Sequence, residues 1–114
     1  MSSKNDAAVR ILLLDKFDKV ADNKKANHAP AKTLIEGYYY SMTRSVELSF
    51  LSNLGAVTVL LENITDGDIQ DYVGNSSNGR MMFPVVPNAA YRMTITTENG
   101  RTYYASFFTE SEND

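Results

Sequence analysis

The chain lacks cysteine and tryptophan entirely, and among its 114 residues there is a single histidine, His28. The absence of cysteine excludes disulfides, zinc-thiolate sites and a cysteine nucleophile. A basic surface is missing too, because eleven lysines and arginines stand against fourteen aspartates and glutamates, for a net charge of −3. Nucleic acid is therefore not an expected partner, since its phosphates bind to dense positive charge.

Long apolar runs are also absent. The longest one near the N-terminus is the four-residue run from Ile11 to Leu14, whereas a membrane-spanning helix needs about 18 apolar residues. We therefore expect no membrane span. The run is also shorter than the apolar core of a signal peptide. The residues alone leave two alternatives open: a cytosolic protein, or an exported protein whose signal sequence is not part of this chain.

What is present is typical of one globular domain. Hydrophobic residues make up 43% of the chain, which is enough for a core at this length. We expect residues 1–8 to be a disordered N-terminal segment, residues 9–109 to form the domain, and residues 110–114 to be an acidic tail. Residues 16–33 are rich in lysine, aspartate and asparagine. They lack the apolar stripe of a stable helix, so we expect a long surface connection there.

The segment from Tyr91 to Phe107 predicts a β-hairpin whose register can be worked out. Apolar and polar side chains alternate on both sides of Asn99-Gly100, as in strands with one buried face. A two-residue turn would place Ile95 opposite Tyr104, whereas a three-residue loop with Gly100 in a left-handed conformation shifts every pair by one residue. The second register brings six apolar groups together, and we prefer its pairs: Ile95 with Tyr103, Met93 with Ala105, and Tyr91 with Phe107.

Similar strand and turn patterns repeat along the chain and predict an all-β fold. A first strand is expected at 9–14 and a central one at 56–62, each apolar on both faces. The short run 69–73 and the proline-containing run 81–86 suit sheet edges, with 74–79 as a flexible loop between them. About seven strands in this length favour an immunoglobulin-like β-sandwich. The expected core consists of Leu13, Val46, Leu48, Phe50, Val57, Val59, Tyr91, Met93, Ile95 and Phe107.

Several short motifs follow one another in a particular order. They are Val46-Glu47-Leu48-Ser49-Phe50, then Asn53-Leu54-Gly55-Ala56-Val57-Thr58-Val59, then Tyr91-Arg92-Met93-Thr94-Ile95, and last Gly100-Arg101-Thr102-Tyr103-Tyr104-Ala105-Ser106-Phe107. In this order they resemble a family of small secreted immunoglobulin-like domains of unknown function from Bacteroides and related bacteria. The resemblance implies an immunoglobulin-like fold and export to the periplasm or cell surface after removal of a signal peptide. It brings no catalytic residue, cofactor or known ligand.

The chain departs from that family pattern in two places. Ala105 stands where a glycine is usual. Asn88-Ala89-Ala90 stands where the turn before the tyrosine-containing strand usually has glycine, which leaves the type of that turn open.

The tyrosines are the side chains of most functional interest. Alternation along their strands directs Tyr39 and Tyr103 inward. The outward set is our candidate surface for a glycan or a protein partner, because aromatic rings stack on sugars and anchor interfaces: Tyr38, Tyr40 and Tyr104. Tyrosine also suits half-buried strands, where it shields cross-strand neighbours, and we favour this structural interpretation over the functional one.

Other combinations of polar residues indicate little chemistry. Asp66, Asp68 and Asp71 surround a turn and could supply oxygen ligands to calcium, but no glutamate follows at the spacing of a calcium-binding loop. Glu36 and Glu47 could form the carboxylate pair of a glycoside hydrolase. A sandwich of this size has little room for the substrate cleft that such an enzyme needs.

These observations predict a non-enzymatic module that makes protein contacts, and the resemblance implies that it is exported and acts at the cell envelope. We expect no catalytic residue, metal or cofactor. The alternative is a carbohydrate-binding module that uses the outward tyrosines, and a small hydrolase is a third hypothesis. The protein is expected to be a monomer or a weak dimer that pairs through an edge strand.

Overall fold

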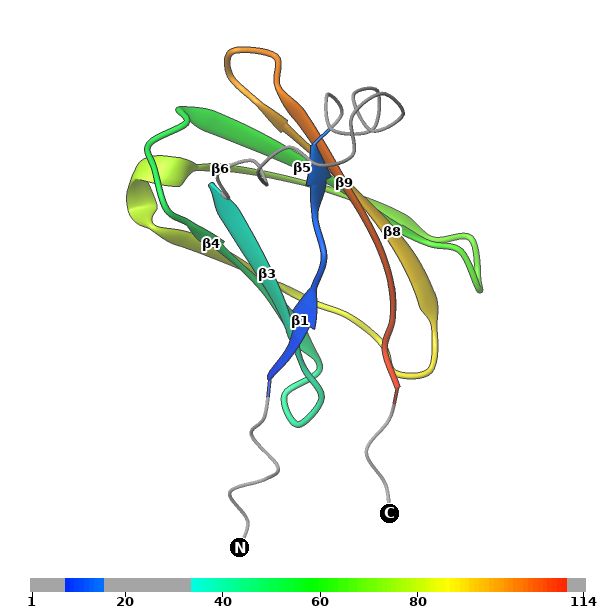
Figure 1. Cartoon of the computed structure of the whole chain (residues 1–114). Helices are drawn as coiled ribbons and strands as arrows, with labels where there is room; N and C mark the ends of the chain where they lie inside the picture. The colour runs from blue at the N-terminus through cyan, green and yellow to red at the C-terminus, as the bar shows by residue number, and fades with distance from the viewer. Residues whose placement is uncertain (1–7, 16–33, 111–114) are drawn as a thin grey trace, which may run out of the picture.

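The computed structural model describes residues 8–15 and 34–110, with Asp15 described by its backbone alone, so His28 and the connection expected at 16–33 lie outside it. Two antiparallel sheets pack face to face (Figure 1). One contains four strands in the order β1-β3-β4-β7, and the other contains five in the order β2-β9-β8-β5-β6. Their bounds are β1 Ala8–Ile11, β2 Leu14–Asp15, β3 Ile35–Tyr40, β4 Ser45–Phe50, β5 Ala56–Asn63, β6 Ile69–Asn75, β7 Arg80–Pro84, β8 Ala90–Thr97 and β9 Thr102–Phe108.

The prediction of a single first strand at 9–14 is wrong, because this segment passes from one sheet to the other. In Figure 1 the blue first segment runs between β3 and β9, at one side of the sandwich. β1 pairs with β3, and β2 pairs with β9 after the chain has crossed over. Ile11 is buried at the crossing, and it lies against Gly37, where an added Cβ would stand 3.3 Å from the Cβ of Ile11. The small residue on β3 therefore makes room for the crossing.

The hairpin of β8 and β9 confirms the register worked out from the side chains. Ile95 pairs with Tyr103, Met93 with Ala105, and Tyr91 with Phe107. Gly100 has φ +90°, a conformation that costs glycine little. The loop is closed at both ends by hydrogen bonds, from Gly100 N–H to the Thr97 carbonyl and from Thr97 N–H to the Arg101 carbonyl.

The positions of the remaining strands are partly as expected. β5 lies between β6 and β8, and β6 and β7 are edge strands of the two sheets. The central place expected for β5 is confirmed, and alternate residues along it are buried. The prediction of a flexible loop at 74–79 is wrong, because β6 continues through Asn75 and a short 3₁₀ turn follows at Ser76–Asn78.

The turn before β8, which the sequence left open, contains Asn88 with φ +57°. Asparagine tolerates this left-handed conformation better than most residues other than glycine. The departure from the family's glycine is therefore compatible with the same kind of turn.

The core lies between the sheets and contains eight of the ten residues expected there. The two exceptions, Leu13 and Phe107, are half-buried and pack against the rim of the core. Phe107 stacks on Tyr91 with ring centres 5.5 Å apart. Phe83, which the sequence did not single out, is only 1% exposed and is the largest fully buried side chain. In the described part of the chain, no helix has the length and apolarity that a membrane crossing requires.

Candidate functional site

The outer face of the four-stranded sheet carries two of the three candidate tyrosines. Alternation along β3 buries Tyr39 and turns Tyr38 and Tyr40 outward, as expected. Glu47 lies directly opposite Tyr38 on β4. These side chains and their charged neighbours form one polar band, which we call the tyrosine–carboxylate band: Arg10, Glu36, Tyr38, Tyr40, Glu47 and Arg80.

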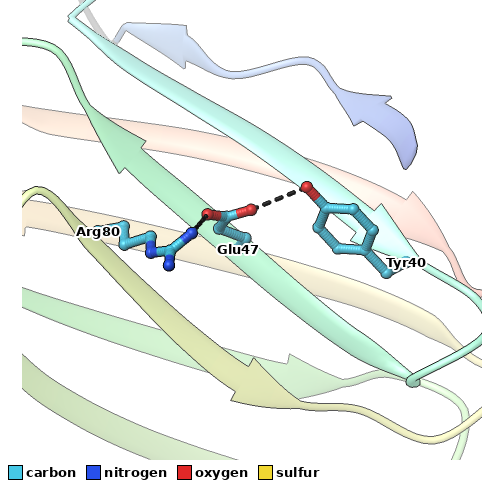
Figure 2. Close-up of polar contacts among 3 residues, drawn as sticks. All are labelled: Tyr40, Glu47 and Arg80. Carbon is cyan, nitrogen blue, oxygen red and sulfur yellow. Dashed lines mark hydrogen bonds and ion pairs between the residues drawn. The ribbon is translucent and has the colours of Figure 1, made fainter. Parts of the chain in front are cut away.

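One half of the band is centred on Glu47 (Figure 2). The Tyr40 hydroxyl donates to Oε1 of Glu47 at 2.8 Å, and Arg80 donates to Oε2 at 2.8 Å. Figure 2 shows the two partners approaching the carboxylate from opposite sides. Only 8% of Glu47 is exposed, so a charge with low solvent exposure is compensated by a cation and a hydroxyl. The three residues join β3, β4 and β7.

The hydrogen bonds lower the pKa of Glu47 from its ordinary value, the one from Arg80 having the largest effect and the one from Tyr40 the next. The same contact raises the pKa of Tyr40, because the hydroxyl donates to a carboxylate. Glu47 is therefore ionised at neutral pH and Tyr40 keeps its proton. In this state Glu47 has no proton to give as a general acid.

The other half of the band is more exposed. The Tyr38 hydroxyl donates to Oε1 of Glu36 at 2.8 Å, which raises the pKa of Tyr38. Arg10 lies 3.8 Å from Glu36 and 5.5 Å from the centre of the Tyr38 ring. These contacts combine an ion pair with a cation–π contact.

The geometry does not support the glycoside hydrolase hypothesis. Glu36 and Glu47 lie on the same face of neighbouring strands. Each carboxylate accepts a tyrosine hydroxyl and faces an arginine, instead of facing the other across a cleft. The arrangement is suited to holding a rigid polar and aromatic surface.

Tyr104 does not belong to this surface. It lies on β9, opposite Leu14 on one side and Thr94 on the other, and Tyr103 beside it is buried. Tyr104 therefore faces outward from the five-stranded sheet, on the opposite side of the sandwich. The candidate set splits into Tyr38 and Tyr40 on one face and Tyr104 on the other.

The aspartates near the β5–β6 turn act as turn residues. Asp66 accepts a hydrogen bond from the N–H of Asp68 at 3.0 Å, and Asp68 accepts one from the Gln70 amide at 3.0 Å. Among the described residues, no group of three or more histidine, cysteine or acidic side chains is placed to hold a metal ion. Asp66, Asp68 and Asp71 are therefore not gathered as ligands around one point.

A pocket of about 220 Å³ lies between the two sheets, and the sequence did not predict it. It opens at the side of the sandwich where β6 and β7 are the edges. Its wall comes from both sheets, so no local sequence pattern indicates it: Leu61, Asn63, Asp68, Gln70, Tyr72, Pro84, Val85, Val86 and Tyr91.

Comparisons with known proteins bear on the fold. No family model matches the chain, and no curated protein matches it. Among solved structures, the chain is similar to a DUF3244 family protein with an immunoglobulin-like β-sandwich fold from Bacteroides vulgatus. The TM-score is 0.64 at 13% sequence identity, over 91% of this chain and 100% of the other.

The protein is an immunoglobulin-like β-sandwich. The structural neighbour has the fold and the bacterial source implied by the resemblance that the motifs suggested. At this identity the likeness concerns the fold alone, and the neighbour is itself described only as a domain of unknown function.

A pH titration tests Glu47, the most buried charged residue in the described part of the immunoglobulin-like domain. The lowered pKa of Glu47 means that the unfolded chain takes up the proton first, near its ordinary value of 4.5. The carboxylate's contribution to stability is therefore complete above that pH and is lost as the pH falls through the lower, folded-state pKa. We expect Glu47→Gln to reduce the free energy of unfolding at pH 7 and to matter progressively less below about pH 4.5.

Urea unfolding from pH 7 to pH 3 measures this difference. Glu110→Gln is the matched control, since it removes one carboxylate from an exposed position after β9. A difference between wild type and Glu47→Gln that stays constant over the whole range would contradict the assignment.

Proposed function

We propose that the protein is an exported, non-enzymatic module that makes protein contacts at the cell envelope. The observation that carries the proposal is the free edge of β6. This strand has seven residues and pairs only with β5 in the described part of the chain. Ile69 is 59% exposed and Val73 is 75% exposed. Residues 69–75 contain no proline or lysine of the kind that protects such edges.

Two further observations support a binding role over an enzymatic one. The carboxylates of the tyrosine–carboxylate band are engaged by tyrosine and arginine, so they do not form a free acid and base pair. The pocket of about 220 Å³ is smaller than the roughly 300–1,000 Å³ of most small-molecule sites. Export is proposed because the motifs resemble a family of secreted domains.

Crosslinking in the natural host cells, with the protein made from its own gene carrying one altered codon, tests this proposal. A photoreactive residue is placed at Val73 on the β6 edge, at Tyr38 on the four-stranded sheet, or at Thr96 on the other sheet. We expect the protein in the envelope fraction, with a discrete crosslinked protein from Val73. A protein confined to the cytosol, or the absence of crosslinked protein from all three positions, would overturn the proposal.

A second candidate function is carbohydrate binding by the tyrosine–carboxylate band. The observation that favours it is the combination of two half-exposed aromatic rings, Tyr38 and Tyr40, with charged hydrogen-bonding groups on one face. Sugars bind to such surfaces through ring stacking and polar contacts.

A glycan array with wild-type protein and two variants tests this candidate. We expect Tyr38→Ala to weaken binding about tenfold, the loss of one stacking contact. Tyr104→Ala is the matched control, because it removes a tyrosine from the opposite face and should leave binding unchanged. No binding to any glycan, or equal losses in both variants, would exclude the band as a sugar site.

A further inference from the structure

We infer that β6 takes an extended segment of another protein as an added strand, with one apolar side chain of that segment inserted into the pocket between the sheets. The inference rests on the proposed role in protein contacts and names the class of partner. It depends on three features of the described residues: the direction of the free backbone groups of β6, the position of the pocket, and the charge along the edge.

The free backbone groups of β6 follow from its ladder with β5. Asn63 N–H donates to the Asp68 carbonyl, and Ser76 N–H donates to the Gly55 carbonyl. In an antiparallel ladder, hydrogen-bonded pairs alternate with non-bonded ones. In this register, the N–H and C=O groups of the even-numbered residues of β6 form the hydrogen bonds with β5. The N–H and C=O groups of Ile69, Asp71 and Val73 point away from the sheet, where a further strand could bind them.

The pocket lies where an added strand would direct its side chains. Two of the inward-facing residues of β6, Gln70 and Tyr72, line the pocket. A residue opposite either of them in an added strand would share this inward face, because the pleat of neighbouring strands is in register. Its side chain would extend toward Pro84 and Val86 on the other wall.

An apolar side chain fits the pocket better than a polar one. The Tyr91 hydroxyl accepts the N–H of Val86 at 2.9 Å and lies 3.4 Å from the side-chain amide of Asn63. The side-chain oxygen Oδ1 of Asn63 accepts the N–H of Asp66 at 3.1 Å. These polar groups are already paired, so an inserted apolar group breaks none of these hydrogen bonds. The volume suits one side chain.

The charge along the edge selects against a second copy of the chain. Residues 64–75 contain three aspartates and no lysine or arginine, and all three aspartates are exposed. Of these, Asp71 lies within β6, and Asp66 and Asp68 lie in the turn before it. Pairing β6 with itself would bring two copies of Asp71 to one seam without any basic side chain from residues 64–75, which like-charge repulsion disfavours. A segment with lysine or arginine on its outward side, opposite Asp71, is complementary.

Selection from a displayed library of nine-residue segments tests this inference on the full chain. We expect enrichment of segments in which apolar residues alternate with lysine or arginine. A peptide made from an enriched segment should slow hydrogen exchange at the amides of Ile69, Asp71 and Val73. No enrichment over scrambled segments, or binding without protection of these amides, would overturn the inference.

Two variants of β6 and a matched control complete the test. Val73→Pro removes an N–H that points away from β5, and Asp71→Lys reverses the charge at the edge. Each variant should bind the enriched peptide with an affinity about tenfold lower than wild type, or lower still. Glu110→Lys makes the same change of charge at an exposed position after β9 and should leave affinity unchanged. Equal affinity for wild type and both β6 variants would contradict the inference.

The outcomes separate this inference from the proposed function. A crosslinked envelope protein that the Val73→Pro variant still binds would leave the protein-contact role standing and remove β6 as its site. Dimerisation in light scattering that Val73→Pro abolishes would identify a second copy as the occupant and overturn the choice of partner.

Discussion

Replacing Phe83 by alanine should lower the free energy of unfolding by about 3–5 kcal/mol, as expected for a fully buried aromatic side chain. Phe83 is 1% exposed and its ring centre lies 4.6 Å from that of Tyr72. It is on β7 and Tyr72 is on β6, so the contact links the edges of the two sheets. Alanine would leave a cavity beside the pocket, which Tyr72 and Pro84 line.

Two other phenylalanines provide a graded control in the same urea or thermal unfolding series. Phe107 is half-buried and stacks on Tyr91, so Phe107→Ala should cost about half as much. Phe108 is 56% exposed, and its replacement should change stability by about 0.5 kcal/mol or less. A Phe107→Ala variant as unstable as Phe83→Ala would contradict the observed burial of the two rings.

Replacing Thr109 by valine should cost about 2 kcal/mol, the effect of leaving buried hydrogen-bonding groups unpaired. Thr109 is fully buried just after β9. Its hydroxyl donates to the Val86 carbonyl at 2.6 Å and accepts the N–H of Ala89 at 3.0 Å. Valine preserves the shape and removes both side-chain contacts, whereas the backbone hydrogen bonds that join Thr109 to Asn88 and Ala89 remain.

Thr109→Ser is the matched variant, because it retains the hydroxyl and removes only a methyl group. It should cost about 1 kcal/mol and keep the amide of Ala89 protected from hydrogen exchange, whereas Thr109→Val should expose that amide. Equal protection of Ala89 in both variants would exclude the hydroxyl as the anchor of this segment.

Local alternation accounts for what was predictable at the candidate site. The pattern of β3 and β9 indicated that Tyr38, Tyr40 and Tyr104 face outward and that Tyr39 and Tyr103 face inward, and the structure agrees. The pattern does not say to which sheet each strand belongs. Tyr104 is therefore on the opposite side of the sandwich from the other two. The contacts of Tyr40 and Arg80 with Glu47 appear only when β3, β4 and β7 are side by side.

The sequence by itself determined the class of fold, most of the core and the register of the β8–β9 hairpin. These features depend on side-chain alternation and on the glycine in one loop, which act within a few residues of one another. Tertiary structure alone decided that residues 8–15 cross between sheets, that Phe107 lies at the rim, and that a pocket opens beside β6. Each of these depends on which distant segments come together, and a period of two specifies the buried face of a strand without specifying what covers it.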